Sequence, residues 1–389
     1  MNSGKTIFSQ FIEQLPQREF SKCVARYNGN YRTRSFSCWD QFLCMGFAQL
    51  AGLDSLGDTV SCLRSRGEKL YHLGIRGHVS KSTLAKANEL RDWRIYEDFA
   101  LHVIGVARKL YAGETWGENL KRSVYAFDSS TIDLCLTLFP WAKFRRHKAA
   151  IKLHTLLDVV SQIPTVIHVT NGKVHDVNLL DELVYEPGAT YLMDRGYIDY
   201  QRLYRLHCDK AFFVTRAKKN AKFQRVESRP VNKAAGIIRD QIVRVANPSM
   251  AECYPECLRR IVYIDPENGK RLVFLTNHFE LSAETIAALY RSRWKVELFF
   301  KWVKQNLRIK AFYGTTENAV KTQIWIAITM YVLAAVIKRR MNLEAPLSQI
   351  LLIFRTSLFE KTPLSEILYG NELLKKEIEH CKPLPLLDF

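Results

Sequence analysis

Residues 124–130, Val-Tyr-Ala-Phe-Asp-Ser-Ser, mark the point at which the spacing of apolar residues changes in this chain of 389 residues. Before them, apolar side chains recur every three or four residues, as in Phe8-Phe11-Ile12, which predicts that residues 1–110 form helices. After them, short β-branched and aromatic runs alternate with helical segments. Strands are expected at 124–127, 151–160, 165–169, 190–193 and 211–215. This alternation predicts an α/β fold with a mixed parallel and antiparallel sheet.

Residues 217–280 interrupt this alternation. They combine a basic, polar stretch with strand-like runs at 241–246, 258–264 and 271–276. The sequence Asp-Pro-Glu-Asn-Gly at 265–269 is a favourable hairpin turn between the last two runs. We therefore expect a β-rich insertion within the α/β core.

Composition limits the class of protein. Hydrophobic residues make up 47% of the chain and charged residues 25%, which excludes a disordered or fibrous protein. The 57 Lys and Arg residues outnumber the 39 Asp and Glu residues, and the net charge of +18 predicts a polyanionic partner, with nucleic acid favoured over an anionic membrane surface. Nine scattered cysteines, an odd number, predict a reduced, cytoplasmic protein. The apolar window 324–337 is shorter than the ~20 residues that cross a bilayer, so a buried helix is expected there.

Helix boundaries complete the expected organisation. Ser80 is predicted to cap a helix running through Trp93 toward Phe99, and Ser282 one running to Arg308. Four parts are predicted: a helical N-terminal domain (1–110) that docks on DNA or serves as a packing module, an α/β core (120–216 with 281–320), the β-rich insertion (217–280), and a helical C-terminal region (321–389).

Three carboxylates are candidate metal ligands. Asp128 and Asp194 each follow a short apolar strand, and ligands collect at strand ends in open α/β sheets. The third, Glu297, lies on the helix that Ser282 is predicted to cap. At ~100° per residue, it shares a stripe about 80° wide with four other side chains. These are Tyr290, Arg293, Lys301 and Lys304. Because the rest of the circumference is largely apolar, the helix is expected to be buried.

This set of side chains matches phosphoryl transfer on a nucleic acid. Three carboxylates can hold two Mg²⁺ ions about 4 Å apart, with Mn²⁺ as a substitute, and oxygen ligands favour these ions over zinc. The cations on the same helix face would bind phosphates. A buried ion-pair network is the alternative interpretation of the same residues.

The spacing of Tyr290, Arg293, Glu297 and Lys304, Y-x₂-R-x₃-E-x₆-K, resembles the signature of the DDE transposases of the insertion-sequence-four family. The segments at Asp128 and at 193–197, Met-Asp-Arg-Gly-Tyr, resemble the first and second catalytic aspartate regions of that family, in the same order. The N-terminal helices and the β-rich insertion also fall where the family has them. The resemblance therefore covers nearly the whole chain.

The resemblance implies a ribonuclease-H-like core in which Asp128, Asp194 and Glu297 bind two divalent metal ions. It implies that Tyr290, Arg293 and Lys304 contact phosphates at the ends of a mobile element. The implied reaction nicks those ends and joins the freed 3′-hydroxyl to target DNA, directly or through a hairpin. The implied assembly is a homodimer on double-stranded DNA in the bacterial nucleoid. A stand-alone nuclease and a catalytically inactive DNA-binding regulator are the alternatives.

Further DNA contacts are expected in three basic segments, 141–154, 216–233 and 289–310, which together carry +17 of the net charge. The first segment has no acidic residue, and DNA-backbone contact is favoured over a solvated face for Lys148 and Lys152. The second is expected to be a flexible DNA-contacting loop, with a solvated charge run as the alternative.

Aromatic and histidine side chains complete the expectations. The best-studied members of the resembled family stack a flipped base on a tryptophan of the insertion, and this chain has none between Trp141 and Trp294. Trp294 is a candidate for that contact, as are three aromatic residues of the insertion, Tyr254, Tyr263 and Phe274. His154 and His168 are interpreted as core histidines. Asp176 is expected to cap a helix, with a fourth metal ligand as the less favoured alternative.

Overall fold

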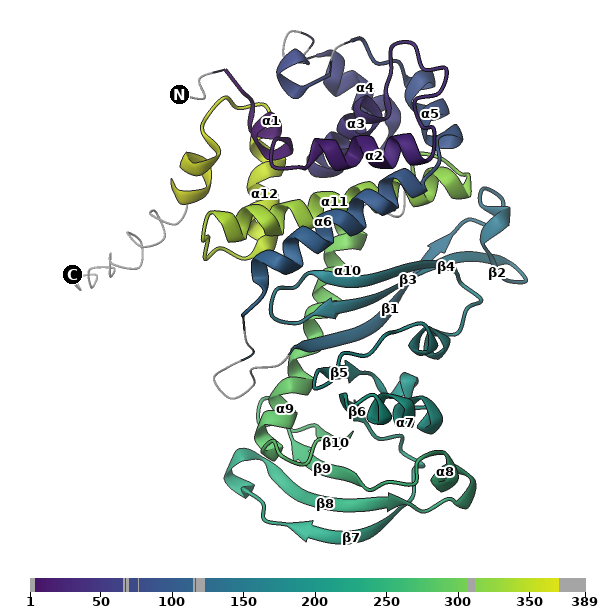
Figure 1. Cartoon of the computed structure of the whole chain (residues 1–389), viewed down its shortest axis with the longest axis vertical. Helices are drawn as coiled ribbons and strands as arrows, with labels where there is room; N and C mark the ends of the chain where they lie inside the picture. The colour runs from purple at the N-terminus through teal and green to yellow at the C-terminus, as the bar shows by residue number, and fades with distance from the viewer. Residues whose placement is uncertain are drawn as a thin grey trace, which may run out of the picture. The chain divides into compact units, whose positions relative to one another are not determined.

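A computed structural model describes residues 4–65, 67, 70–75, 77–114, 116, 123–306 and 312–370 (Figure 1). Its contacts divide the chain into two compact units, residues 1–112 with 302–389 and residues 113–301. The helical regions expected at the two ends of the chain therefore fold into one unit. The predictions for residues 307–311 and 371–389, including the end of the predicted helix at Arg308, lie outside the described residues.

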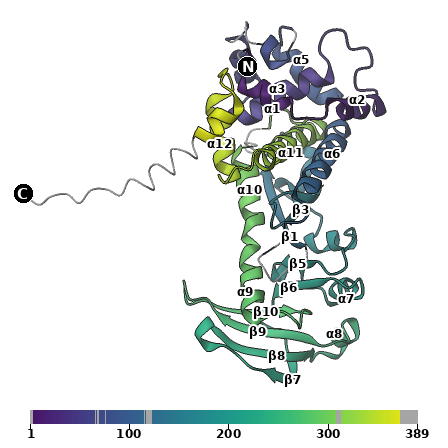
Figure 2. The ribbon, with the colours of Figure 1, turned by 60° about the vertical axis from the view of Figure 1, so that its left-hand side comes forward.

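The helical unit is built around α11 (Glu317–Arg340), which lies alongside α6 (Arg94–Tyr111) in both views (Figures 1 and 2). Within the described part of the chain, α11 is the one helix long and apolar enough to cross a membrane, but 94% of its apolar window is buried in the protein. It is a core helix, as the sequence predicted for 324–337. The other elements of the unit are α1 (Ile7–Ile12), α2 (Gln17–Arg26), α3 (Cys38–Ala51), α4 (Leu56–Arg64), η2 (Tyr71–Leu73), α5 (Lys81–Leu90) and α12 (Leu347–Ser357).

The prediction of one helix from Ser80 toward Phe99 is wrong. Ser80 does cap α5, but Arg91 adopts an extended backbone with ψ 134° and the chain restarts as α6. The side-chain amide of Asn318 donates to the carbonyls of Asn88 and Arg91. A contact from the far end of the sequence thus satisfies backbone groups that a continuous helix would have paired internally.

The second unit contains a ten-stranded sheet. Its strands are β1 (Val124–Leu134), β2 (Lys143–Arg145), β3 (Lys148–Asp158), β4 (Pro164–Asn171), β5 (Thr190–Met193), β6 (Phe212–Arg216), β7 (Phe223–Arg229), β8 (Ile237–Val245), β9 (Leu258–Ile264) and β10 (Arg271–Thr276). The order is β2-β3-β1-β5-β6-β10-β9-β8-β7, and β4 also pairs with β3. Strands β3 and β4 form an antiparallel run with β1, whereas β5 and β6 continue from β1 in parallel. This is the mixed parallel and antiparallel sheet that the sequence predicted.

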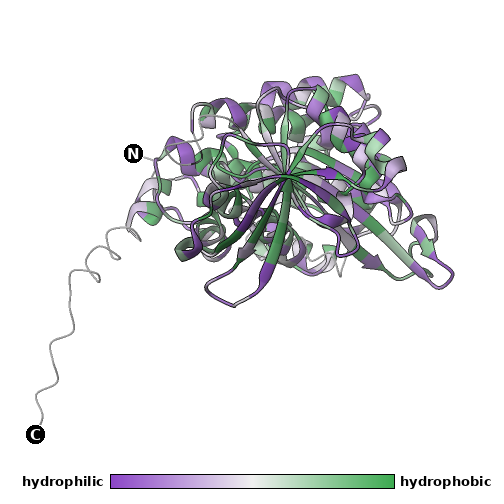
Figure 3. Cartoon of the chain, turned by 90° about the horizontal axis from the view of Figure 1, so that it is seen from below, coloured by the Kyte–Doolittle hydropathy of each residue, from purple (hydrophilic) through white to green (hydrophobic). Residues whose placement is uncertain are grey.

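Helices cover the two faces of this sheet differently. On one face, Phe127, Met193 and Phe213 join a buried cluster with Leu203 and Leu206 of α7 (Tyr200–Cys208). Because side chains alternate along a strand, the residues next to them point to the opposite face. Helix α9 (Ala283–Ser292) lies on that opposite face, and Figure 2 shows α7 and α9 on either side of β5 and β6. The chain between the elements is mostly hydrophilic (Figure 3).

The β-rich insertion extends the same sheet. Strand β10 pairs with β6, and the hairpin predicted at 265–269 joins β9 to β10. The basic segment 216–233, expected to be a flexible loop, instead includes the edge strand β7, paired antiparallel with β8. Next to α9, the buried side chain of Arg259 binds the carboxylate of Asp240.

The helix predicted from Ser282 to Arg308 is described as far as Asn306. Ser282 caps α9, a single turn residue, Arg293, follows, and α10 (Trp294–Asn306) continues along the same line (Figure 2). The expectation that this helix is buried nearly all round is wrong, because Trp294 is 58% exposed and Leu298 44% exposed.

Candidate active site

Two of the predicted carboxylates are brought together by strand pairing. Phe127 of β1 pairs with Met193 of β5, and Asp128 and Asp194 are the next residue on each strand. Met193 ends β5, whereas β1 continues to Leu134, so Asp128 lies within a strand and not after one as expected. Both aspartates sit where the parallel pairing of β1 and β5 stops.

Two members of the predicted stripe on α9 and α10, Tyr290 and Arg293, contact these two aspartates. Arg293 lies between two carboxylates: Nη1 is 3.0 Å from Oδ2 of Asp128, and Nη2 is 2.5 Å from Oε1 of Glu297. The hydroxyl of Tyr290 lies 3.4 Å from Oδ1 of Asp194. Side chains from three elements far apart in sequence therefore meet on one face of the sheet.

A second arginine, Arg216, joins the site from the end of β6. Leu192 pairs with Val214, so Arg216 continues beside Asp194, and its Nη2 lies 2.6 Å from Oδ1 of Asp194. The guanidinium carbons of Arg216 and Arg293 lie 5.8 Å and 5.7 Å from the centroid of the Tyr290 ring. Tyr290 is thus a shared platform for two cations, each of which holds an aspartate.

The two aspartates differ in their electrostatics. Burial raises the pKa of Asp128 above its usual value, although Arg293 and the Ser129 amide favour the ionised form. Burial also acts to raise the pKa of Asp194, but the Arg216 hydrogen bond and the arginine charges outweigh it, so that pKa lies below its usual value. Two inequivalent carboxylates follow from one being more deeply buried and the other more directly paired.

Donor chemistry suits a hard divalent cation, since oxygen-only carboxylate ligands favour Mg²⁺ or Mn²⁺. A metal site also requires that the ligating side chains lie close together. Among the residues that the structure describes, no group of three Asp, Glu, His or Cys side chains is close enough to hold a metal ion. The cause is visible in the contacts, because Arg293 lies between Asp128 and Glu297 and Arg216 covers Asp194.

Comparison with known proteins shows the family of this chain. A family profile described as a transposase DDE domain matches residues 119–333, more than half of the chain. The chain belongs to the transposase DDE domain family. It is a DDE transposase of the insertion-sequence type, as the spacing of Tyr290, Arg293, Glu297 and Lys304 predicted. A second profile, for a domain of unknown function, matches residues 3–76 of the transposase.

Several relatives of the transposase are known. A protein of Sinorhizobium fredii named as a transposase is 34% identical over 244 residues, which are 62% of this chain and 68% of that protein. A protein of Geobacillus stearothermophilus, named as a transposase for an insertion sequence element, is 33% identical over 208 residues, 53% of this chain and 54% of its own. A Synechocystis protein named in the same way is 24% identical over 323 residues, 81% of this chain and 87% of its own. A solved structure of piggyBac transposase in a synaptic complex with hairpin DNA matches with a TM-score of 0.44 at 12% identity, over 97% of this chain and 84% of that chain.

The remaining predicted DNA contacts of the transposase are spread more widely. Lys301 and Lys304 of α10 and Lys148 of β3 are exposed. Lys152 does not fit the prediction of a phosphate contact. Its side chain is only 12% exposed, and its ammonium binds the carbonyl of Val174 and the carboxylate of Asp176.

The same cluster corrects two smaller predictions. Asp176 is the first residue of the 3₁₀ helix η4 (Asp176–Asp181) and does not cap it. His154 is buried, as expected, and burial lowers its pKa to about 4 while Asp176 opposes that shift and Lys152 and His168 add to it. The side chain of His168 is 38% exposed, so it is not a core histidine.

Exposure separates the aromatic candidates for base stacking. The three residues of the insertion, Tyr254, Tyr263 and Phe274, are all less than one-tenth exposed. Trp294 is exposed and lies with Arg291 along a groove of about 440 Å³. It is therefore the candidate of the four with an accessible ring.

Sequence reasoning missed Arg216 as a member of the site, because it was counted with the basic run that follows it. One signal could have found it. Arg216 ends the next parallel strand at the level of Asp194, the first residue after β5, and residues at the ends of neighbouring parallel strands lie side by side.

Proposed function

We propose that this transposase binds the terminal inverted repeats of its element, nicks the DNA at the ends, and joins the freed 3′-hydroxyl groups to target DNA. The observation that supports this proposal is the meeting of Asp128, Asp194 and Glu297 around the arginine and tyrosine side chains of one helix and one strand. Carboxylates suit metal-assisted phosphoryl transfer, and guanidinium groups suit the phosphates on either side of the cleaved bond.

The three carboxylates would hold two Mg²⁺ ions, which supply activation of the attacking oxygen and stabilisation of the leaving oxygen. Arg293 and Arg216 would bind the phosphates that flank the scissile bond, and their planar forks fix the orientation of those phosphates. The ring of Tyr290 would hold both guanidinium groups in place through cation–π contacts. Lys301, Lys304 and Lys148 would extend the contact along the backbone, and Trp294 would stack on an unpaired base.

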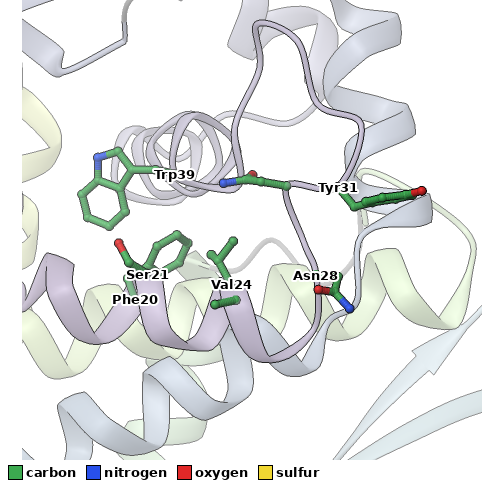
Figure 4. Close-up of a pocket in the computed structure, with 8 residues that line it drawn as sticks. Phe20, Ser21, Val24, Asn28, Tyr31 and Trp39 are labelled. Atoms are coloured by element: carbon green, nitrogen blue, oxygen red, sulfur yellow. The ribbon is translucent and has the colours of Figure 1, made fainter.

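The helical unit offers a further DNA contact in residues 17–34, which hold five basic side chains and one acidic one. Figure 4 shows a pocket beside α2, with Tyr31 and Trp39 at opposite ends, and its volume is about 400 Å³. Tyr31 is 72% exposed, and Arg32 lies over its ring at 5.1 Å. We propose that this surface binds the DNA backbone outside the cleavage site. Replacing the exposed Arg34 by Gln should reduce the salt dependence of DNA binding by about one counterion, whereas Lys361→Gln in the same unit should not.

Cleavage of an end-containing duplex with Mg²⁺ tests the site. Asp128→Ala and Asp194→Ala should lose cleavage while end binding survives, since each removes a metal ligand and no phosphate contact. Asp133→Ala is the matched control, because it removes an exposed carboxylate from the opposite face of β1. Undiminished cleavage by Asp194→Ala would overturn the assignment.

Two further assays separate the alternatives. A stand-alone nuclease would cut the duplex but fail to join pre-nicked ends to a target plasmid, whereas the transposase should join them. A catalytically inactive regulator would bind the ends without cutting at any Mg²⁺ or Mn²⁺ concentration. Joining should also require two ends in one complex, because we propose that the transposase acts as a homodimer. Sedimentation of the protein with end DNA measures this directly.

A further inference from the structure

Arg216 is the member of the site that the sequence did not predict. It binds Asp194 and is also open to a ligand from solvent. Its Nη2 binds Asp194, yet its side chain is 34% exposed and can be reached from solvent. The Nε groups of both Arg216 and Arg293 are buried and have no hydrogen-bond partner in the described part of the chain. A buried donor without an acceptor destabilises the folded state by about 1–3 kcal/mol, so a ligand that supplies an acceptor to either guanidinium group would be favoured.

A phosphate group can supply these acceptors. It offers several acceptor oxygens to a planar fork, and Arg216 and Arg293 lie at similar distances from one ring, that of Tyr290. The same two arginines now offset two of the three carboxylate charges. A divalent cation and a guanidinium compete for the same carboxylate oxygens, and in the described part of the chain no three metal-ligating side chains are close enough together to hold a metal ion.

We propose that Arg216 is a positioning residue that exchanges partners, holding Asp194 when no DNA is bound and a DNA phosphate when DNA is bound. The exchange frees Asp194 for a divalent cation. DNA and metal should then strengthen each other's binding by the same factor, since coupling between two sites is reciprocal. This inference rests on the proposed function, in that Asp194 is taken to be a metal ligand.

Binding measurements test the exchange without any turnover. The free Mn²⁺ signal in electron paramagnetic resonance gives the Mn²⁺ affinity of the full chain, with and without a duplex of the inverted repeat that flanks the gene. For the wild-type protein, DNA should tighten Mn²⁺ binding at least about fivefold, the lower end of typical coupling between sites. Fluorescence anisotropy should show the same factor for the effect of Mn²⁺ on DNA affinity. Ca²⁺ can replace Mn²⁺ where cleavage must be prevented.

Arg216→Gln removes the competing cation. It should bind Mn²⁺ several-fold more tightly than wild type in the absence of DNA, and DNA should tighten that binding by less than about twofold. A purely structural role predicts the reverse, a weaker Mn²⁺ site. Arg216→Met, which keeps the apolar stem against Tyr290, provides the same comparison if the Gln variant is unstable. Arg244→Gln is the matched control, because it removes an exposed arginine of β8 in the same sheet and should leave both Mn²⁺ affinities and their ratio unchanged.

The outcomes distinguish this inference from the proposed function. If Asp194→Asn leaves Mn²⁺ affinity unchanged, the proposed metal site is wrong. If Asp194→Asn abolishes Mn²⁺ binding while Arg216→Gln and Arg216→Met bind Mn²⁺ no more tightly than wild type, the metal site stands and the exchange by Arg216 is overturned. Equal coupling in wild type and both Arg216 variants would overturn it as well.

Discussion

The buried ion pair between Arg259 and Asp240 should help to anchor the insertion to the start of α9. The Arg259 and Asp240 side chains are only 2% and 4% exposed, and two parallel hydrogen bonds of 2.9 Å and 2.6 Å join them. Arg259 also donates to the carbonyls of His278 and Leu281, immediately before Ser282 caps α9. One side chain therefore ties β8 and β9 to the start of the helix that carries Tyr290.

Arg259→Ala should destabilise the second unit by about 3–5 kcal/mol, because it leaves a buried carboxylate without its partner. That loss is a large part of the ~5–15 kcal/mol by which a typical domain is stable. The double variant Asp240→Leu with Arg259→Met should recover more than half of it, since the unpaired charge is gone and only the two carbonyls remain unsatisfied. Arg260→Ala is the matched control. Arg260 is the next residue, is half-buried, and donates to Gln241, so its loss should cost less than about 1 kcal/mol.

Hydrogen exchange of peptides from β9, followed by mass spectrometry, is the appropriate assay. It measures the free energy of local opening and does not require that the two units unfold together. The same variants should be tested for end cleavage, because misplacement of α9 would move Tyr290 away from the aspartates. A change below about 1 kcal/mol for Arg259→Ala, equal to that of Arg260→Ala, would refute the reasoning.

Three further predictions concern other parts of the second unit. The pKa of His154 is about 4 in the folded state and about 6.5 in the unfolded state, so the unfolded state binds the proton more readily. The free energy of unfolding should therefore fall by up to about 3 kcal/mol as the pH drops from 6.5 to 4. In urea unfolding curves, His154→Gln should reduce this dependence of the unfolding free energy on pH. Gly236 has φ +81°, and an added Cβ would lie 2.5 Å from the carbonyl oxygen of Ile264. Gly236→Ala should therefore reduce the free energy of unfolding by about 2 kcal/mol or more and lower the melting temperature. An unchanged melting temperature would contradict this. Trp294→Ala should change the free energy of unfolding by less than about 0.5 kcal/mol. In anisotropy titrations it should weaken binding of a duplex with an unpaired base by about 1–3 kcal/mol. Equal affinity of the wild-type protein and the variant for this duplex would exclude base stacking.

Local sequence patterns predicted most of the fold. The strands 190–193, 258–264 and 271–276 have the predicted bounds, and Ser80 and Ser282 both cap helices. These features depend on periodicity and on capping side chains, which act over a few residues. The prediction was wrong where contacts between distant segments determine the backbone, as at Arg91, where an amide from α11 replaces helical hydrogen bonds.

The candidate site divides in a similar way. Asp128, Asp194 and Glu297 could be proposed from sequence because a short apolar run before an aspartate and the spacing along a helix are local properties. The role of Lys152 could not, because a basic run does not reveal that Asp176 and a carbonyl on a later segment take up its ammonium. Trp294 belongs to the apolar circumference from which a buried helix was predicted, yet it is 58% exposed in the folded chain.

By itself, the sequence determined the residue types and spacings of a DDE transposase, including the stripe of Tyr290, Arg293 and Glu297 on one helix face. Only the tertiary structure decided what that stripe faces. The parallel pairing of β1, β5 and β6 places Arg216 in the same row as the two aspartates, and the helix on that face brings a second arginine against them. The physical reason is that strand pairing joins residues far apart in sequence, such as Phe127 and Met193, which are 66 positions apart, and no local pattern records which side chains become neighbours across strands.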